Sequence, residues 1–164
     1  MSEPDFISKV VAQTIAQQRV ESWKKSRETI VFTNGVFDLL HPGHVIYLEA
    51  AKKLGTKLVV GINSDASTKT LNKGNNRPIN DQDARSCVLA ALASTDLIVI
   101  FDGKDPLHLI KALMPDVLVK GGDYTVEDIV GSKEVISNGG MVKSLPFLDG
   151  YSTSKIEQKI RGKG

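Results

Sequence analysis

Residues 30–48 have the sequence Ile-Val-Phe-Thr-Asn-Gly-Val-Phe-Asp-Leu-Leu-His-Pro-Gly-His-Val-Ile-Tyr-Leu, and this stretch decides the fold. Residues 30–33 are typical of a buried strand. Asn34-Gly35 predicts a turn. Pro42-Gly43 predicts the start of a helix, because Pro suits the first helical position, where no backbone N–H is needed. The chain therefore passes from strand through turn to helix.

Two histidines, His41 and His44, flank the predicted start of this helix. Their spacing lets both side chains point to one side, beside unpaired amides and the positive end of the helix dipole. Gly35 and Gly43 carry no Cβ, so a large anion can approach the backbone. Capping and core packing are the alternative use of such histidines, but their place between a strand and a helix favours a phosphate site. A zinc site is disfavoured because no third ligand accompanies them.

The rest of the chain alternates apolar strands with helices, which predicts a parallel sheet covered on both faces. Right-handed crossovers favour a single Rossmann-like, doubly wound α/β domain with five strands in the order 3-2-1-4-5. An amphipathic pattern at residues 4–25 predicts an extra N-terminal helix. The other predicted strands are 57–62, 97–101, 117–119 and 141–145, and the other predicted helices are 43–54, 82–93, 105–113 and 153–160.

In this order the strands at 30–33 and 117–119 are neighbours, and ligands bind where the winding reverses, at the carboxyl ends of such strands. The second of these strands ends in Lys120-Gly121-Gly122-Asp123-Tyr124. This loop offers a cation, two glycines that can lie against a base or ribose, a carboxylate and an aromatic ring. Alone it would be a turn with a helix-capping Asp, but its place beside the histidines favours nucleotide binding.

Three further segments complete the predicted site. Residues 66–80 are polar and predict a mobile loop, from which Lys73 and Arg77 could close over a phosphate; the alternative is a solvated surface loop. Arg85 lies near the start of the helix at 82–93. Tyr151-Ser152-Thr153-Ser154 begins the last helix, where Ser152 could be only a cap, although hydroxyls and free amides also suit a triphosphate.

Composition excludes several other classes of protein. The net charge is +2, and no dense basic run with interleaved aromatic residues is present, so nucleic acid binding is not predicted. Cys87 is the single cysteine, so no intrachain disulfide can form. No signal peptide or run of transmembrane length is present, so we expect a cytoplasmic protein without a membrane partner.

The stretch Thr-Asn-Gly-Val-Phe-Asp-Leu-Leu-His-Pro-Gly-His at 33–44 resembles the His-x-Gly-His signature of the nucleotidyltransferase superfamily, over residues 29–161. Within it the chain is most similar to monofunctional adenylyltransferases that make ADP-heptose, through 33–35, 63–65, 119–124, 146–147 and 150–153. Val36 departs from the Cys that heptose enzymes often carry, but a backbone N–H would serve a phosphate there whatever the side chain. Domains are therefore expected at 1–28, a helical extension, and 29–164, the nucleotidyltransferase.

This resemblance implies that His41 and His44 hold a phosphate and the transition state, with Lys120 as the third catalytic residue. Ser152 to Ser154 would contact the β and γ phosphates of ATP. The predicted nucleotide-binding residues are Thr33, Asn34, Gly35, Val36, Phe37, Gly43, Arg85, Gly121, Gly122, Asp123, Tyr124, Tyr151, Ser152, Thr153 and Ser154. The predicted sugar-phosphate-binding residues are Asp38, Asn63, Asp65, Lys73 and Arg77.

The predicted reaction is transfer of AMP from ATP, bound with Mg²⁺, to heptose 1-phosphate, which serves surface-polysaccharide synthesis. Two alternatives remain open. One is a cytidylyltransferase acting on an alditol phosphate such as glycerol 3-phosphate, and the other is a nucleotide-binding module without catalysis. The amphipathic first helix also predicts a homo-oligomer, with a dimer as the simplest form.

Overall fold

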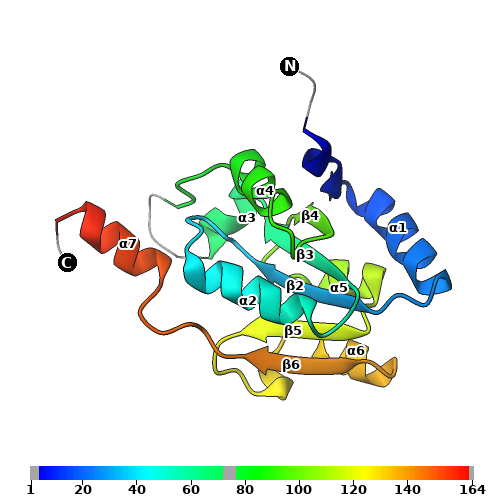
Figure 1. Ribbon diagram of the computed structural model, residues 1–164. Coiled ribbons are helices and arrows are strands. Elements are labelled where there is room, and N and C mark those ends of the chain that lie inside the picture. Colours follow the sequence, from blue (N-terminus) through cyan, green and yellow to red (C-terminus); the bar gives the residue numbers. More distant parts are fainter. Residues whose placement is uncertain (1–3, 72–76, 163–164) are drawn as a thin grey trace.

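The computed structural model describes residues 4–71 and 77–162 (Figure 1). Its centre is a parallel sheet of six strands in the order β1-β4-β3-β2-β5-β6. Val, Ile and Leu are the commonest residues of the strands, as expected when both faces of a parallel sheet are covered. They are β1 (Val10–Val11), β2 (Ile30–Gly35), β3 (Lys57–Asn63), β4 (Leu97–Phe101), β5 (Val117–Gly121) and β6 (Met141–Leu145).

The prediction of a five-stranded sheet is wrong in the number of strands, since β1 adds a sixth at one edge. Across the sheet the five predicted strands lie in the order β4-β3-β2-β5-β6, which corresponds to 3-2-1-4-5, and β1 lies beside β4. Val10 lies opposite Ile98 and Val11 opposite Val99, so β1 covers the edge of β4 that would otherwise leave its backbone groups unpaired. The helix predicted at 4–25 is therefore interrupted, and becomes the 3₁₀ helix η1 (Asp5–Lys9), β1 and α1 (Gln13–Lys25).

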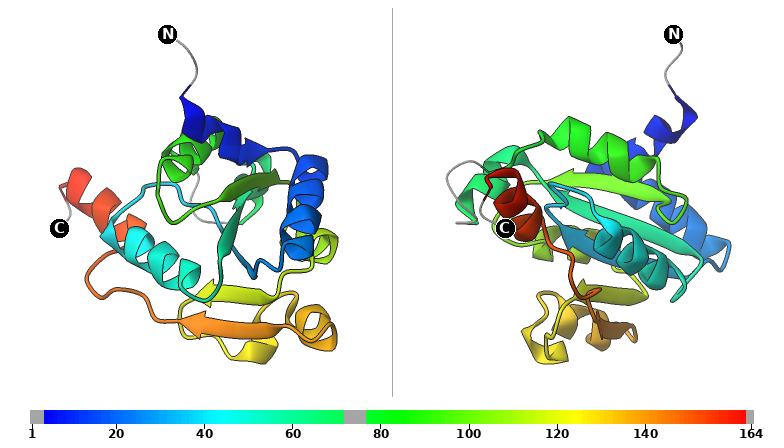
Figure 2. Two further views of the ribbon diagram at one scale, coloured as in Figure 1. Left: turned by 45° about the vertical axis from the view of Figure 1, so that its right-hand side comes forward. Right: turned by 60° about the vertical axis from the view of Figure 1, so that its left-hand side comes forward.

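Helices cover both faces of the sheet (Figure 2). Successive residues of β2 point to opposite faces, so Phe32 packs in one core cluster and Val31 in the other. The cluster around Phe32 contains apolar residues of α1, α5 (Leu107–Leu113) and α6 (Ser132–Ser137). The cluster around Val31 contains residues of α2 (Pro42–Lys52) and α4 (Gln82–Ala90).

Part of the segment predicted as a loop at 66–80 is a helix, α3 (Asp65–Thr70). Ser64 caps it by accepting a hydrogen bond from the Ser67 amide at 3.1 Å, and the Thr68 hydroxyl donates to the Ser64 carbonyl at 2.8 Å. Polar residues therefore satisfy one another inside the fold, and their polarity did not indicate exposure. The 3₁₀ helix η2 (Val126–Asp128) and α7 (Thr153–Ile160) complete the described elements.

Candidate active site

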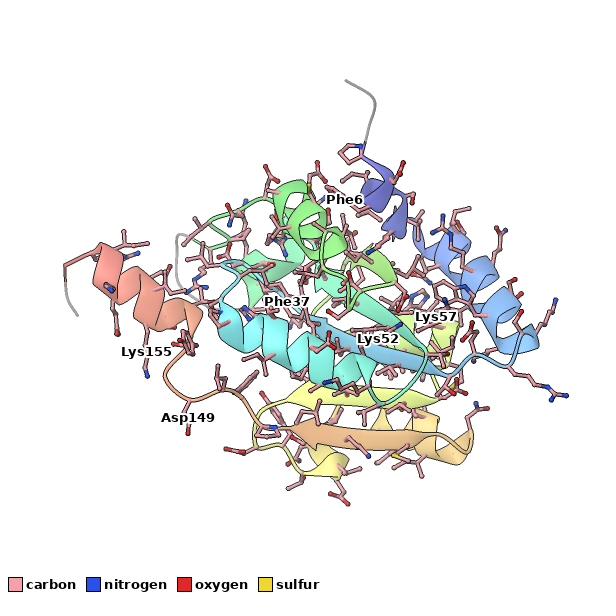
Figure 3. The ribbon with its side chains drawn as sticks, in the orientation of Figure 1. Phe6, Phe37, Lys52, Lys57, Asp149 and Lys155 are labelled. Atoms are coloured by element: carbon pink, nitrogen blue, oxygen red, sulfur yellow. The ribbon has the colours of Figure 1, made fainter. Side chains whose placement is uncertain are left out.

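The site begins at the turn that follows β2. Phe37 in this turn has a backbone φ of 52°, in the left-handed region that a bulky residue rarely adopts. Its ring lies over Gly35, where a Cβ would come within 3.0 Å of the ring atom Cε2. The ring also meets His44 edge-on, at 5.3 Å between centroids. Figure 3 labels Phe37 where β2 gives way to the first turn of α2.

The two histidines lie side by side at the start of α2, as their spacing predicts. His41 is the N-cap residue, followed by Pro42 at the first helical position. The imidazole rings stack with centroids 3.8 Å apart and planes 21° apart. Glycine at position 43 suits this stacking, because a Cβ would lie 3.0 Å from His41 Nδ1 and would crowd the ring. The pair thus forms one surface of two rings at a helix N-terminus.

The environment of His41 favours the neutral form of its imidazole. Its burial lowers the pKa of the imidazole below the ordinary value of 6.5, although a backbone hydrogen bond opposes this shift. Its Nδ1 is buried and has no hydrogen-bond partner among residues 4–71 and 77–162. A buried polar atom without a partner is unusual in a folded protein and often marks a ligand site. His41 therefore has a ring nitrogen available for a ligand.

A cavity of about 540 Å³ opens where the carboxyl ends of β2 and β5 meet. This is the switch point at which open α/β sheets bind ligands. Of the predicted site residues, the structure brings these to its lining: Asn34, Gly35, Val36, Phe37, Asp38, His44, Arg77, Lys120, Gly121, Tyr124, Thr153 and Ser154. The cavity is thus lined by residues from segments that are far apart in the sequence.

Lys120 joins the two strand ends. Its Nζ lies 3.4 Å from both the carbonyl and the side-chain oxygen of Asn34, so the end of β5 is linked to the end of β2. With Arg77 it gives the lining two cationic side chains. Together with the amides at the start of α2, these cations suit an anion with several charges.

Two aromatic residues of the lining, Tyr47 and Phe147, were not predicted. Tyr47 lies one helical turn after His44, and its hydroxyl is 2.6 Å from the Thr33 hydroxyl; burial raises the pKa of Tyr47 to about 12. Phe147 is 57% exposed and lies 6.1 Å from Tyr47 between ring centroids. The one available signal was the i, i+3 spacing of Tyr47 from His44, which places it on the same face of the helix.

The glycine after Lys120 is fixed by these rings. A Cβ on Gly121 would lie 2.5 Å from Phe147 Cε1 and 3.1 Å from Tyr47 Cε2, so no other residue fits without movement of a ring. Gly122 has a φ of 115°, which also favours glycine. Thus the packing of the protein and its backbone conformation both favour glycine at these two positions.

Several predicted residues lie outside the lining. Arg85 has a fully buried side chain beneath the cavity, where it donates to the Val36 carbonyl at 2.7 Å, the Asn80 carbonyl at 3.1 Å and the Asp65 carboxylate at 2.7 Å. Asn63 is buried and donates to Ser67 Oγ at 2.8 Å. These groups hold the surrounding loops together and do not reach the cavity.

The remaining predicted residues are placed as follows. Thr33 lies in β2 below the cavity, bonded to Tyr47, and Ser152 caps α7 by accepting from the Lys155 amide at 3.1 Å. Tyr151 lies 6.4 Å from His41 between ring centroids. His41, Gly43, Gly122 and Asp123 adjoin lining residues in the chain without lining the cavity themselves. Lys73 lies outside the described residues.

The carboxylates near the cavity do not form a metal site. No three His, Cys, Asp or Glu residues within 4–71 and 77–162 are grouped so that they could hold an ion. Asp38, the acidic residue of the lining, accepts backbone hydrogen bonds at 2.9 Å from the amides of Ile79 and Asn80. Within the same residues, none of the helices is both long and apolar enough to cross a membrane.

Comparison with known proteins adds to this geometry. Residues 32–159 match the model of the cytidylyltransferase-like family. The chain is 51% identical over 158 residues to the bifunctional protein HldE of Koribacter versatilis, covering 96% of this chain and 32% of that protein. It is 52% identical over 152 residues to HldE of Cronobacter sakazakii, covering 93% and 32%. The chain therefore spans about a third of the length of these relatives.

Solved structures share the fold. A lipopolysaccharide core biosynthesis protein from Thermoplasma volcanium superposes with a TM-score of 0.60 at 27% identity, over 76% of this chain and 99% of that chain. A pantoate-β-alanine ligase from Francisella tularensis superposes with a TM-score of 0.62 over 93% of this chain and 76% of that chain, but at 15% identity it supports the fold alone.

Proposed function

Because this chain belongs to the cytidylyltransferase-like family, we propose that it transfers AMP from ATP to heptose 1-phosphate, giving ADP-heptose and pyrophosphate. The observation that carries the proposal is the stacked His41–His44 pair at the start of α2, beside a cavity that Lys120 and Arg77 line. The choice of heptose is supported by the similarity to HldE proteins and by the motifs at 63–65, 119–124 and 146–153. The cationic lining supports phosphate substrates, and the relatives support a heptose as the sugar that carries the acceptor phosphate.

We place the nucleotide along the switch point. The α-phosphate would lie at the start of α2, where His44 and Lys120 supply donors and the positive end of the helix dipole faces the anion. Thr153 and Ser154 line the cavity from the start of α7 and would bind the β and γ phosphates. The base and ribose would lie against Gly121-Gly122 and Tyr124. The acceptor phosphate would then approach from the side of Asp38 and Arg77.

The proposed step is an in-line displacement. An oxygen of the sugar phosphate forms a bond to the α-phosphorus, while the bond from that phosphorus to the oxygen shared with the β-phosphate breaks and pyrophosphate leaves with the electron pair. A phosphate monoester dianion is already a nucleophile, so no general base is needed. Positioning and charge stabilisation therefore supply the catalysis. His44 and Lys120 stabilise the negative charge that develops on the α-phosphate oxygens.

Mg²⁺ is expected to arrive with ATP. The described residues offer no cluster of ligands for an ion, and the Asp38 carboxylate is engaged by backbone amides, so the phosphates themselves would supply most of the coordination. Bound there, the ion would neutralise charge on the departing pyrophosphate. Since ATP and the sugar phosphate are both intracellular metabolites, we further propose that the protein works in the cytoplasm.

The test is a comparison of nucleotides and acceptors. Pyrophosphate release is measured with ATP or CTP, each in the presence of D-glycero-D-manno-heptose 1β-phosphate or glycerol 3-phosphate. Release with ATP and heptose phosphate alone is the expected result. Release with CTP and glycerol 3-phosphate alone would favour the cytidylyltransferase alternative, to which the family description also points. Nucleotide binding without release in any combination would favour a non-catalytic module.

A further inference from the structure

Arg77 of the cavity lining makes a close ion pair with a residue of the last helix. Its Nη2 donates to Glu157 Oε2 at 2.5 Å, and the two side chains are only 10% and 20% exposed. Glu157 belongs to α7, and it was not among the predicted site residues. A carboxylate of the protein therefore pairs with a cationic side chain that lines the proposed substrate site.

The other carboxylate near Arg77 is a weaker partner. Asp38 Oδ2 lies 3.6 Å from Arg77 Nη1, beyond hydrogen-bond distance. Both oxygens of Asp38 already accept from the backbone amides of Ile79 and Asn80 at 2.9 Å. Asp38 thus serves mainly to fix the segment that follows Arg77. Glu157 is the group that closely pairs with the guanidinium charge.

Arg77 also keeps a donor that Glu157 does not use. Its Nε is buried and has no hydrogen-bond partner in the part of the chain that the structure describes. A guanidinium presents Nε–H and one Nη–H along a single edge, and this edge binds two oxygens of one anion. Glu157 takes the Nη2 donor alone. A phosphate, with three terminal oxygens, is better suited to both donors than this carboxylate is.

Glu157 belongs to a helix at the surface of the molecule. No residue of α7 is buried, and the helix extends from the end of the sheet beyond the first turn of α2 (Figure 1). Near its start, the Thr153 hydroxyl reaches the Leu39 carbonyl only at 3.5 Å. A Glu released from such a helix returns to water, where a carboxylate is well solvated. The ion pair is therefore the part of the α7 contact that an incoming anion would displace.

We infer that Glu157 is an internal stand-in for a substrate phosphate. It neutralises Arg77 before substrate binds and is displaced when a phosphate of ATP or of the acceptor sugar reaches the cavity. This inference rests on the proposed function, because the displacing phosphate comes from its substrates. It makes Glu157 an autoinhibitory group, whose removal strengthens binding. A residue that merely held Arg77 in place would have the opposite effect.

The test measures binding by calorimetry, separately for ATP and for D-glycero-D-manno-heptose 1β-phosphate. Glu157→Gln keeps an oxygen that can accept from Arg77 but removes the charge. We expect the ligand whose phosphate meets Arg77 to bind about three- to tenfold more tightly to this variant, because a competing charge-assisted hydrogen bond is replaced by a neutral one of about half its strength. The two ligands identify which phosphate it is.

Two controls make the result specific. Glu21→Gln removes the same charge from an exposed position on α1, at the other end of the molecule, and should leave both affinities unchanged (Figure 1). In an Arg77→Lys background, which lacks the two-donor edge, Glu157→Gln should lose most of its effect. Unchanged or weaker binding of both ligands to Glu157→Gln would overturn the inference while leaving the proposed function standing. Failure of the wild type to bind either ligand would overturn both.

Discussion

His44 is the residue on which the proposed chemistry depends most. It lines the cavity, stacks on His41 and is held edge-on by Phe37, whose backbone is strained to reach that position. Strain of this kind persists where the surrounding structure needs the side chain in one place. Here it fixes a hydrogen-bond donor before substrate arrives, which is the condition for effective charge stabilisation.

His44→Ala should therefore reduce turnover strongly. Loss of one preorganised donor typically lowers kcat by about a hundred- to a thousandfold. His108→Ala is the matched control, because His108 is exposed on α5, and it should leave kcat unchanged. Steady-state rates of pyrophosphate release measure both. Near-normal turnover of His44→Ala would remove His44 from the mechanism.

His41 is half-buried, and its lowered pKa predicts that the stability of the protein depends on pH. Because burial lowers the pKa of His41 below 6.5, the unfolded chain binds a proton more tightly than the folded one. The free energy of unfolding should therefore be highest above pH 6.5 and fall as the pH drops from 6.5 through the lowered pKa. His41→Asn should lack this part of the decrease.

The measurement compares urea unfolding of the wild type and His41→Asn at about pH 8 and about pH 5.5. The difference in unfolding free energy between the two proteins removes the titrations that they share. At the lower pH the wild type should have lost more unfolding free energy than the variant. The same difference at both pH values would show that His41 titrates alike in the folded and unfolded chains.

Arg85 was predicted to bind nucleotide, but the structure gives it a different environment. From a fully buried position it connects three segments of the chain, by hydrogen bonds to Val36, to Asn80 and to Asp65 at the start of α3. Arg85→Lys keeps a positive charge near Asp65 but cannot make all three bonds, so we expect a loss of about 1 to 3 kcal/mol in unfolding free energy, typical of leaving a buried polar partner unsatisfied. Arg161→Lys, at the exposed end of α7, should change nothing. Unaltered stability with weakened ATP binding would instead support a direct contact with nucleotide.

At the scale of elements, the end of β5 and the segment after β6 form one unit. Phe147 lies so close to Gly121 that a methyl group there would overlap its ring. Gly121→Ala should therefore displace Phe147 and raise the KM for ATP by about three- to tenfold, an effect on the order of 1 kcal/mol. In a Phe147→Ala background the same change should matter less, since the main clash is gone. If Gly121→Ala raised the KM equally in both backgrounds, the Phe147 ring would not be the cause of the rise.

Most elements could be predicted because their apolar pattern is continuous. The last helix, 153–160, has the predicted bounds, and the five main strands lie at or within a few residues of theirs. β1 could not be predicted, since Val10 and Val11 fit the apolar stripe of a helix and only the open edge of β4 makes them a strand. Similarly, α3 is polar along its length and is held by its own hydroxyls, a tertiary effect that hydrophobic periodicity cannot detect.

The residues of the site that follow the strands could be predicted, whereas those from the segments after the last strand could not. Lys120 and His44 line one cavity because strand order follows from crossover handedness, and that order could be inferred. Phe147 and Glu157 come from segments after the last strand, and no rule of topology says where such segments return. Arg85 and Asn63 have structural roles that depend on their hydrogen bonds, and residue type alone does not reveal those bonds.

At the scale of the whole molecule, the prediction of a dimer loses its original reason. The first helix was expected to offer an apolar face to a second subunit, but Ala16 and Val20 of α1 are buried in the chain's own core. A dimer thus stays a prediction without a described surface.

The measurement that tests the account most directly follows the α-phosphate of ATP. ATP carrying radioactive phosphorus at that position is incubated with the protein, Mg²⁺ and D-glycero-D-manno-heptose 1β-phosphate, and the products are separated. The account predicts that the label moves into ADP-heptose in an amount equal to the unlabelled pyrophosphate released, and that His44→Ala nearly abolishes this transfer. Label that stays in ATP, or that appears in AMP without sugar, would contradict it.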